Sequence, residues 1–362
     1  MKFALKVCAI DENESIFLDI VRLLSAQFVF FGHLLSFSYG SEALIGGRIP
    51  IQNLGVVVFF ILSGYLICRT LPKYVDFKEF FIDRFARIYV TLVPCLLVIA
   101  ILDYFMKANG NFSYVSAYTF TTWIGNLFML QDYPVLQLAT SGLGLGEPLM
   151  TSFGSARPLW TLAVEWWLYM FVGYVCLTKQ RKVSIVAGLA IVPFVFATVG
   201  RGQGLTLFWL LGGAIIYVGE WSVKTKYLTA AAVGLSMLYC ARIAASKDFY
   251  DLQANFFLSA LFCALLMWSR RTAFFTALPA VLKSLFRVLA GASFALYLLH
   301  YSIIELLRSF GIGKAQVAVL AIVTANVLAV LIYLVFDKNH KKLGMRLRKM
   351  AAPAVKSSGD AA

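Results

Sequence analysis

The stretch Ile16–Phe37, IFLDIVRLLSAQFVFFGHLLSF, decides how the rest of the chain is arranged. As an α-helix it is long enough to cross the roughly 30 Å hydrocarbon core of a bilayer, yet it contains Asp19, Arg22 and His33. The eleven-residue step from Arg22 to His33 makes three turns plus about 20°, so both side chains share one face, roughly 16 Å apart. Ionisable groups at such depth often mark functional sites. The alternative is structural, with His33 bonded to a neighbouring helix and Arg22 reaching the membrane surface.

The composition predicts an integral membrane protein. Of the 362 residues, 60% are hydrophobic and only 14% are charged, whereas soluble domains are about half apolar and a quarter charged. The net charge of +14 does not indicate nucleic-acid binding, because the basic residues form short clusters between apolar runs, as membrane topology requires. The six cysteines form no CxxC pair and have no histidine at ligand spacing, so they predict neither a disulfide framework nor a metal site.

The apolar runs predict an all-α, polytopic fold with about ten transmembrane helices. An even number places both termini on one side. The basic residues favour that side by roughly three to one, so both termini are expected in the cytoplasm. We expect a transmembrane domain over 1–345 and a disordered, basic cytoplasmic tail over 346–362. The expected spans are 16–38, 51–70, 88–106, 158–177, 183–199, 204–221, 227–245, 252–269, 288–309 and 315–336.

Two connections between these spans have patterns of their own. The segment 73–87, KYVDFKEFFIDRFAR, alternates charged residues with phenylalanines, which predicts an amphipathic helix on the cytoplasmic surface leading into the third span. The segment 107–158 lies on the outer face, and loops of about fifty residues commonly carry function. An unstructured spacer is the alternative. Within it, 120–130 is expected to form an interfacial helix.

Three ionisable residues reach one depth in their expected spans. At about 1.5 Å per residue, His33, Glu165 and His300 lie roughly 24, 20 and 18 Å from the cytoplasmic surface. A carboxylate and two imidazoles at one level predict a shared polar cavity, and a structural hydrogen-bond network is the alternative. Glu305 and Arg308, near the outer end of the ninth span, are expected to form a plain ion pair.

Arg84 and Arg87 stand at the cytoplasmic mouth of the third span, in the sequence RFAR. At i, i+3 they share one helix face. Two guanidinium groups suit a phosphate-bearing ligand, because arginine can bind phosphate through two hydrogen bonds. Basic residues at this boundary also set topology and bind anionic lipid, which is the alternative reading.

The same residues carry a resemblance to the acyltransferase-3 family of integral membrane acyltransferases, which modify extracytoplasmic sugars and other acceptors. Val90 stands where the family often has proline, and Trp166 and Trp167 follow Glu165 where a polar residue is common; these tryptophans either shape an acceptor-specific wall or face lipid. The similar segments, in the family's order, are DIVRLLSAQFVFFGH (19–33), FFILSGYLI (59–67), RFARI (84–88), LWTLAVEWWLYM (159–170) and SFALYLLH (293–300).

The resemblance implies an enzyme of the inner (plasma) membrane that moves an acyl group, acetyl in the first instance, from cytoplasmic acyl-CoA to a hydroxyl of a cell-surface glycan or lipid-linked sugar. Acyl-CoA is then a substrate, with no permanently bound cofactor, no metal and no nucleic acid. The partners are membrane lipid, the donor and the glycan or glycolipid acceptor.

The resemblance also assigns roles to residues. His33 would act as general base on the acceptor hydroxyl, and a covalent acyl-histidine is the variant mechanism. Arg22 would orient the donor, or organise the helix with Asp19, and Glu165 would orient His33 or the acceptor. The remaining implied site residues are Arg84 and Arg87 for the CoA phosphates, and Trp160, Tyr169 and His300 for substrate.

A competing interpretation is a proton-coupled transporter or flippase, since midplane histidine and glutamate would suit that task. The sequence shows no pair of broken helices in two halves and no internal repeat, which disfavours it. A membrane-embedded sensor or assembly protein would not need three ionisable groups at one depth. The acceptor stays open among peptidoglycan, exopolysaccharide, lipopolysaccharide, a lipochitooligosaccharide and a small molecule.

Overall fold

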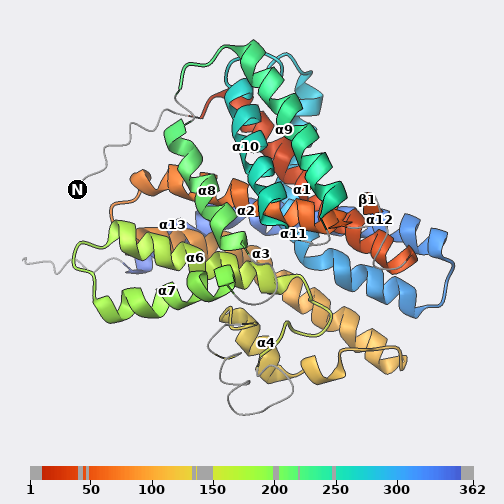
Figure 1. Cartoon of the computed structure of the whole chain (residues 1–362). Coiled ribbons are helices and arrows are strands. Elements are labelled where there is room, and N and C mark those ends of the chain that lie inside the picture. Colours follow the sequence, from red (N-terminus) through yellow and green to blue (C-terminus); the bar gives the residue numbers. More distant parts are fainter. Residues whose placement is uncertain are drawn as a thin grey trace, which may run out of the picture.

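The computed structural model describes residues 10–39, 44–45, 49–132, 136, 150–198, 204–218, 221–246 and 250–351. This part of the chain is almost entirely helical (Figure 1), with one two-residue antiparallel pairing of β1 (Leu44–Ile45) and β2 (Ile49–Pro50). The helices are α1 (Glu12–Tyr39), α2 (Ile51–Thr70), α3 (Phe77–Ala108), α4 (Phe120–Leu127), α6 (Leu159–Leu177), α7 (Val183–Thr198), α8 (Leu205–Val218), α9 (Thr225–Ala245), α10 (Leu252–Ser269), α11 (Ala280–Ser309), α12 (Lys314–Val335) and α13 (His340–Ala351).

The all-α prediction is confirmed, and each expected span falls on a helix. Among the described residues, eight helices are long and apolar enough to cross a membrane. The other two expected spans correspond to α7 and α8, which have 16 and 14 residues. A full crossing takes about 20 residues, so length and composition support eight crossings and leave the predicted count of ten a prediction.

The helix predicted over 73–87 and leading into the third span is present from Phe77 onward, and its position on the membrane surface stays a prediction. Residues Leu71–Lys73 form a 3₁₀ turn, and α3 then runs without a break from Phe77 to Ala108. The side chain of Asp76 accepts a hydrogen bond from the Glu79 backbone N–H and so caps the helix. No residue between this cap and the third span interrupts the helix, so the amphipathic segment forms the first turns of a membrane-length helix.

The connection between α3 and α6 and the C-terminal tail both contain helix. Helix α4 occupies most of the interfacial helix expected over 120–130, and the side chain of Thr119 caps it. At the other end of the chain, α13 continues to Ala351, so the first residues of the expected disordered tail are helical. Residues 133–135, 137–149 and 352–362, on which the rest of these predictions fall, lie outside the described residues.

The centre of the fold is α1, which packs against α2 and α11. Helix α11 also packs against α3 and α12, and α9 and α10 form a pair of their own (Figure 1). Helix α2 meets α8 almost backbone to backbone. A Cβ placed on Gly212 would lie 2.0 Å from the Ile61 carbonyl oxygen, and one on Gly64 would lie 1.8 Å from that of Trp209. Small residues of this kind let membrane helices approach closely.

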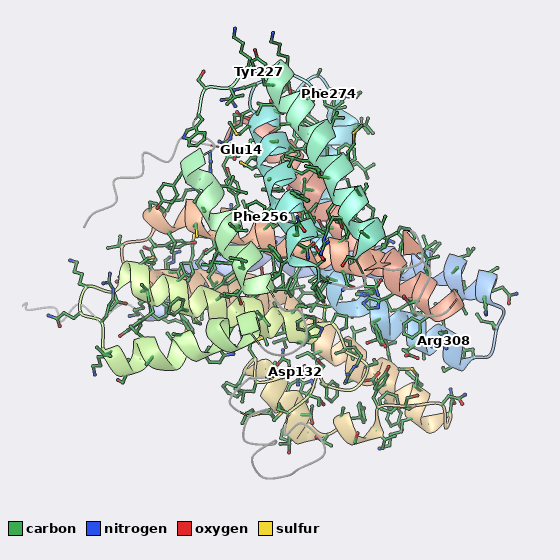
Figure 2. The ribbon with its side chains drawn as sticks, viewed as in Figure 1. Glu14, Asp132, Tyr227, Phe256, Phe274 and Arg308 are labelled. Carbon is green, nitrogen blue, oxygen red and sulfur yellow. The ribbon has the colours of Figure 1, made fainter. Side chains whose placement is uncertain are left out.

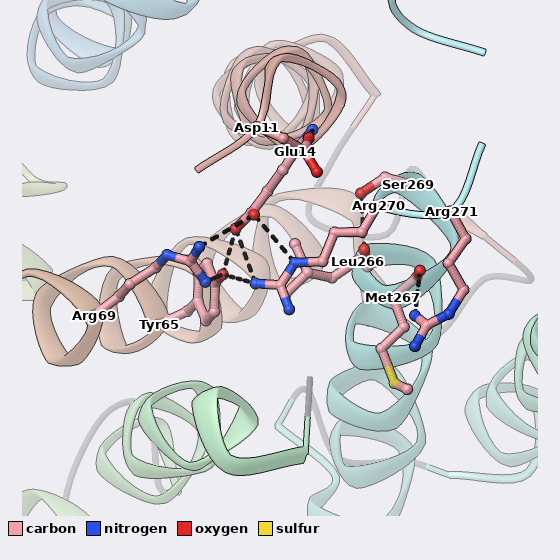
Figure 3. Close-up of polar contacts among 9 residues, drawn as sticks. All are labelled: Asp11, Glu14, Tyr65, Arg69, Leu266, Met267, Ser269, Arg270 and Arg271. Atoms are coloured by element: carbon pink, nitrogen blue, oxygen red, sulfur yellow. Dashed lines mark hydrogen bonds and ion pairs between the residues drawn. The ribbon is translucent and has the colours of Figure 1, made fainter. Parts of the chain in front are cut away.

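A cluster of buried charges joins three helices at one end of the bundle (Figure 3). Glu14, at the start of α1, is 1% exposed. Its carboxylate accepts hydrogen bonds from Tyr65 and pairs with Arg69 at 3.3 Å and with Arg270 at 3.1 Å. The beginning of α1, the end of α2 and the end of α10 therefore lie on one face. Figure 2 shows Glu14 far from Arg308, which lies at the end of α11.

We expect Glu14→Gln to destabilise the protein by about 3–5 kcal/mol, because it leaves two largely buried guanidinium groups without their carboxylate. The control is Glu12→Gln on the same turn of α1. Glu12 is largely exposed and pairs with Lys283, and such exposed pairs contribute about 0–1 kcal/mol. Thermal unfolding in detergent measures both variants. Equal melting temperatures for the two would contradict a structural role for the cluster.

We expect Gly212→Ala to lower the melting temperature by pushing α8 away from α2, at a cost of about 1–3 kcal/mol. Gly234→Ala on α9 is the matched control, because a Cβ there meets nothing within 4 Å. That variant should be neutral or slightly stabilising, since alanine favours helix. If the two substitutions shift the melting temperature alike, the close α2–α8 contact is not essential to the fold.

Candidate active site

The structure brings the two predicted span histidines together. The rings of His33 on α1 and His300 on α11 are stacked, with centroids 5.3 Å apart and an interplanar angle of 28°. His300 is fully buried, whereas His33 is half-buried. His33 is therefore the more exposed of the two rings, and His300 lies deeper in the bundle.

The protonation pattern of His300 follows from its hydrogen bond. Its Nδ1 lies 3.1 Å from the Leu296 carbonyl oxygen. A carbonyl only accepts hydrogen bonds, so Nδ1 carries the proton, and in the neutral ring Nε2 has a free lone pair. That Nε2 is buried and has no hydrogen-bond partner within the described residues. The histidine pair thus contains an available proton acceptor.

Aromatic and charged side chains surround His33 toward the C-terminal ends of α1 and α11. The Tyr301 ring meets His33 edge to face, with centroids 5.3 Å apart. The Tyr301 hydroxyl lies 3.0 Å from that of Tyr114, which donates to Glu305 at 3.1 Å. The ion pair predicted between Glu305 and Arg308 is present at 3.7 Å. This side of the histidine pair has the mixture of rings and polar groups that small-molecule sites use.

A cavity of about 210 Å³, partly open to solvent, lies on the other side of the histidine pair. It is formed mainly by α1, α2, α3, α6 and α11. Three arginines and the glutamate that the sequence predicted as site residues line this cavity. His33 is not among the residues that line the cavity. The site residues in its wall are Arg22, Arg84, Arg87, Glu165, Tyr169 and Tyr297.

Glu165 therefore belongs to the cavity of the arginines, and the structure shows no contact that would let it orient His33. The Tyr169 hydroxyl donates to the Glu165 carboxylate at 2.5 Å and lies 2.7 Å from the Ser63 hydroxyl. Ser63 in turn accepts a hydrogen bond from the Trp209 indole at 3.1 Å. Groups on α2, α6 and α8 thus fix the carboxylate in the cavity wall.

Each of the three cavity arginines has a carboxylate beside it. Arg22 pairs with Asp19 at 3.3 Å, Arg84 pairs with Asp83, and Arg87 pairs with Asp337. These partners do not use every donor, because a guanidinium has five N–H groups. The pairing fixes the orientation of the guanidinium groups and leaves donors for a ligand in the cavity.

The predicted tryptophans do not line the cavity. Trp160 is half-buried and packs against the hydrophobic core. Trp166 is buried and contacts the rings of Tyr89 and Phe81, and the Trp167 indole donates to the Met129 carbonyl at 2.9 Å. Trp166 and Trp167 therefore hold α6 against α3 and the outer connection.

Tyr297 connects the two halves of the site. Its ring lines the cavity, and its centroid is 6.0 Å from that of His300. Its hydroxyl is hydrogen-bonded to Thr161 on α6. Tyr297 thus stands between the arginine cavity and the histidine pair. Tyr297 lies within the segment SFALYLLH, but no role was predicted for it from the sequence.

The sequence reading also missed Asp103 and Asp337. Asp103 is fully buried on α3, where Ser155 donates to it from both its backbone N–H and its hydroxyl, and Ser155 further bonds Ser302 on α11. This contact fixes the connection between α3 and α6 to α11, two residues from His300. A carboxylate inside the apolar run 88–106 was the available signal. The described residues contain no group of three His, Cys, Asp or Glu side chains able to hold a metal.

Comparison with known proteins gives related sequences. An O-acetyl transferase of Shigella phage Sf6 is 28% identical over 175 residues, which cover 48% of this chain and 50% of that protein. The ORF330 protein of Acidianus two-tailed virus, whose name states acetyltransferase activity as an inference, is 24% identical over 277 residues, or 72% of this chain and 75% of that protein. The first alignment therefore spans half the length of the phage protein. No solved structure matches the chain.

A family profile described as an acyltransferase domain matches residues 15–336, which include the histidine pair, the arginine cavity and Tyr297. The match covers nearly the whole chain and every membrane-length helix that builds the site. This multi-helix membrane protein therefore belongs to the acyltransferase-3 family.

Proposed function

We propose that this protein transfers an acyl group, acetyl in the first instance, from cytoplasmic acyl-CoA to a hydroxyl of a glycan or lipid-linked sugar across the membrane. The observation that carries the proposal is the division of the site by Tyr297, with three arginines on one side and two stacked histidines on the other. An anionic donor and a hydroxyl acceptor need these two kinds of environment.

The donor side follows from charge and shape. Arg84 and Arg87 would bind the CoA phosphates, to which arginine can donate paired hydrogen bonds. The buried Nε of Arg84 has no partner within the described residues and is available for such a bond. Arg22, also in the cavity wall, would orient the donor, whose thioester would reach the histidines past Tyr297. Acyl-CoA is a substrate in this scheme, and acetyl is chosen because one relative is named an O-acetyl transferase.

The chemical step uses the histidine pair. His33 would take the proton from the acceptor hydroxyl as its oxygen attacks the thioester carbonyl carbon. The carbon–sulfur bond breaks, and the imidazolium returns the proton to the departing CoA thiolate. His300, stacked behind His33 with its Nε2 lone pair free, would support the proton transfer. Tyr301, Tyr114 and Glu305 would form the acceptor's approach, since rings and carboxylates suit a hydroxyl-rich ligand.

We further propose that the protein lies in the inner (plasma) membrane with both termini in the cytoplasm. The support is that the start of α1, the ends of α2 and α12 and the start of α3 share one face, as shown by the pairs of Glu14 with Arg69 and of Arg87 with Asp337. The ends of α2 and α10 on that face, with the connections that follow them, contain Arg69, Lys73, Arg270 and Arg271. An excess of basic residues favours the cytoplasmic side.

Membranes containing the protein, incubated with radiolabelled acetyl-CoA, should transfer label to a glycan or lipid fraction. Membranes with His33→Ala should show kcat lowered by roughly 10²- to 10⁴-fold, with the same amount of inserted protein and the same melting temperature. Full activity of this variant would reject the base assignment. Movement of a substrate across the membrane without label transfer would favour a transporter.

The double variant Arg84→Ala with Arg87→Ala should raise the KM for acetyl-CoA by roughly tenfold or more, because two charge-assisted phosphate contacts are lost. The control is Lys224→Ala with Lys226→Ala, a pair of exposed cations at the start of α9. The control should leave donor KM unchanged. Equal donor kinetics in both double variants would show that the arginines serve topology alone.

A further inference from the structure

The C-terminal segment returns to the helix that carries the arginine pair. After α12 the chain makes a 3₁₀ turn at Asp337–Asn339 and continues as α13, which packs against α3 (Figure 1). Two polar contacts hold this segment on α3, one at each end. Both involve the turns of α3 that contain Arg84 and Arg87.

The first contact is made by Asp337, which is 1% exposed. Its carboxylate pairs with Arg87 and lies 3.6 Å from the His340 ring nitrogen. The start of the C-terminal segment thus sets the position of one cavity arginine directly.

The second contact is made by Arg348, near the end of α13. Its guanidinium donates to Glu79 at 2.6 Å and lies 3.6 Å from Oδ1 of Asp83. The other oxygen of Asp83, Oδ2, accepts from the Tyr74 hydroxyl at 2.6 Å and from Arg84. Asp83 therefore links Arg348 on α13 to Arg84 in the cavity wall.

The link from Arg348 through Asp83 to Arg84 affects the electrostatic potential that an anionic ligand meets in the cavity. Asp83 orients Arg84, but a carboxylate beside a phosphate site also repels the phosphates. Arg348 offsets that repulsion by neutralising Asp83 from the side opposite Arg84. Because such a half-exposed ion pair adds little to folding stability, its larger effect should fall on ligand binding. Loss of Arg348 leaves Arg84 to balance the charge of Asp83, removes the cation beside Glu79 and loosens α13, and these effects weaken donor binding.

We propose that α13 supports the donor site through α3, without lining the cavity itself, and that Arg348 is a positioning residue for a phosphate-bearing donor, acting through Asp83 on Arg84. This inference rests on the proposed binding of acyl-CoA phosphates by Arg84 and Arg87. It adds a segment beyond residue 336, where the family match ends.

The test compares two arginines on one helix. Arg348→Ala should raise the KM for acetyl-CoA by roughly three- to tenfold, with kcat and acceptor KM within about twofold of the parent. Arg346→Ala, which removes an exposed cation two residues away, should leave all three values within about twofold and so controls for general attraction of the donor. Arg348→Gln, which keeps much of the side chain without the charge, should behave as Arg348→Ala, and its melting temperature checks folding.

A double-mutant cycle identifies the route. In an Asp83→Asn background, Arg348→Ala should change donor KM by less than about twofold, because no carboxylate remains to be neutralised. An equal factor in both backgrounds overturns the proposed route through Asp83. An Arg348→Ala variant that matches Arg346→Ala overturns the proposal as a whole. If Arg84→Ala with Arg87→Ala also leaves donor KM unchanged, the donor site itself fails; if that double variant raises KM, the failure is confined to α13.

Discussion

A charge inside a membrane-embedded bundle requires a partner, and that requirement explains how these helices meet. An unpaired buried charge costs several kcal/mol, so in the described part of the chain buried charges such as Glu14, Arg69, Asp103 and Asp337 lie beside a carboxylate, a guanidinium or a hydroxyl. Glu14 links α1, α2 and α10 through Arg69 and Arg270. Arg87 and Asp337 link α3 to the end of α12. Apolar packing alone would not specify these neighbours, because lipid tails are as apolar as the helix surfaces.

The same requirement shapes the site. Each cavity arginine forms an ion pair with an aspartate, and the three aspartates are Asp19, Asp83 and Asp337. The carboxylates hold the guanidinium groups in place before any ligand arrives, and preorganisation of this kind reduces the entropy lost on binding. Tyr297 separates this charged region from the histidine pair. A donor with charged phosphates at one end and a reactive thioester at the other matches that division.

The sequence predicted how deep a residue lies along its helix. It did not predict which neighbouring helix the side chain of that residue faces. The rise per residue gave the depth of His33 and His300, and the two rings do meet. The same calculation placed Glu165 at that level, yet its side chain faces the arginines, because depth does not say which neighbour a face will meet. Asp337 and Arg348 lie about 250 residues or more from their partners on α3, and no local pattern reports such a contact. The cap at Asp76 was readable from the sequence and would have moved the start of the predicted amphipathic helix from residue 73 to Phe77.

The central claim is a single route from the arginine cavity, past Tyr297, to the histidine pair. A cryo-electron microscopy structure with a non-hydrolysable acetyl-CoA analogue tests it most directly. The account predicts phosphates beside Arg84 and Arg87, the pantetheine arm along the cavity, and the acyl carbonyl beyond Tyr297 against His33. An analogue bound with its acyl end away from the histidines, or bound outside the cavity altogether, would contradict it.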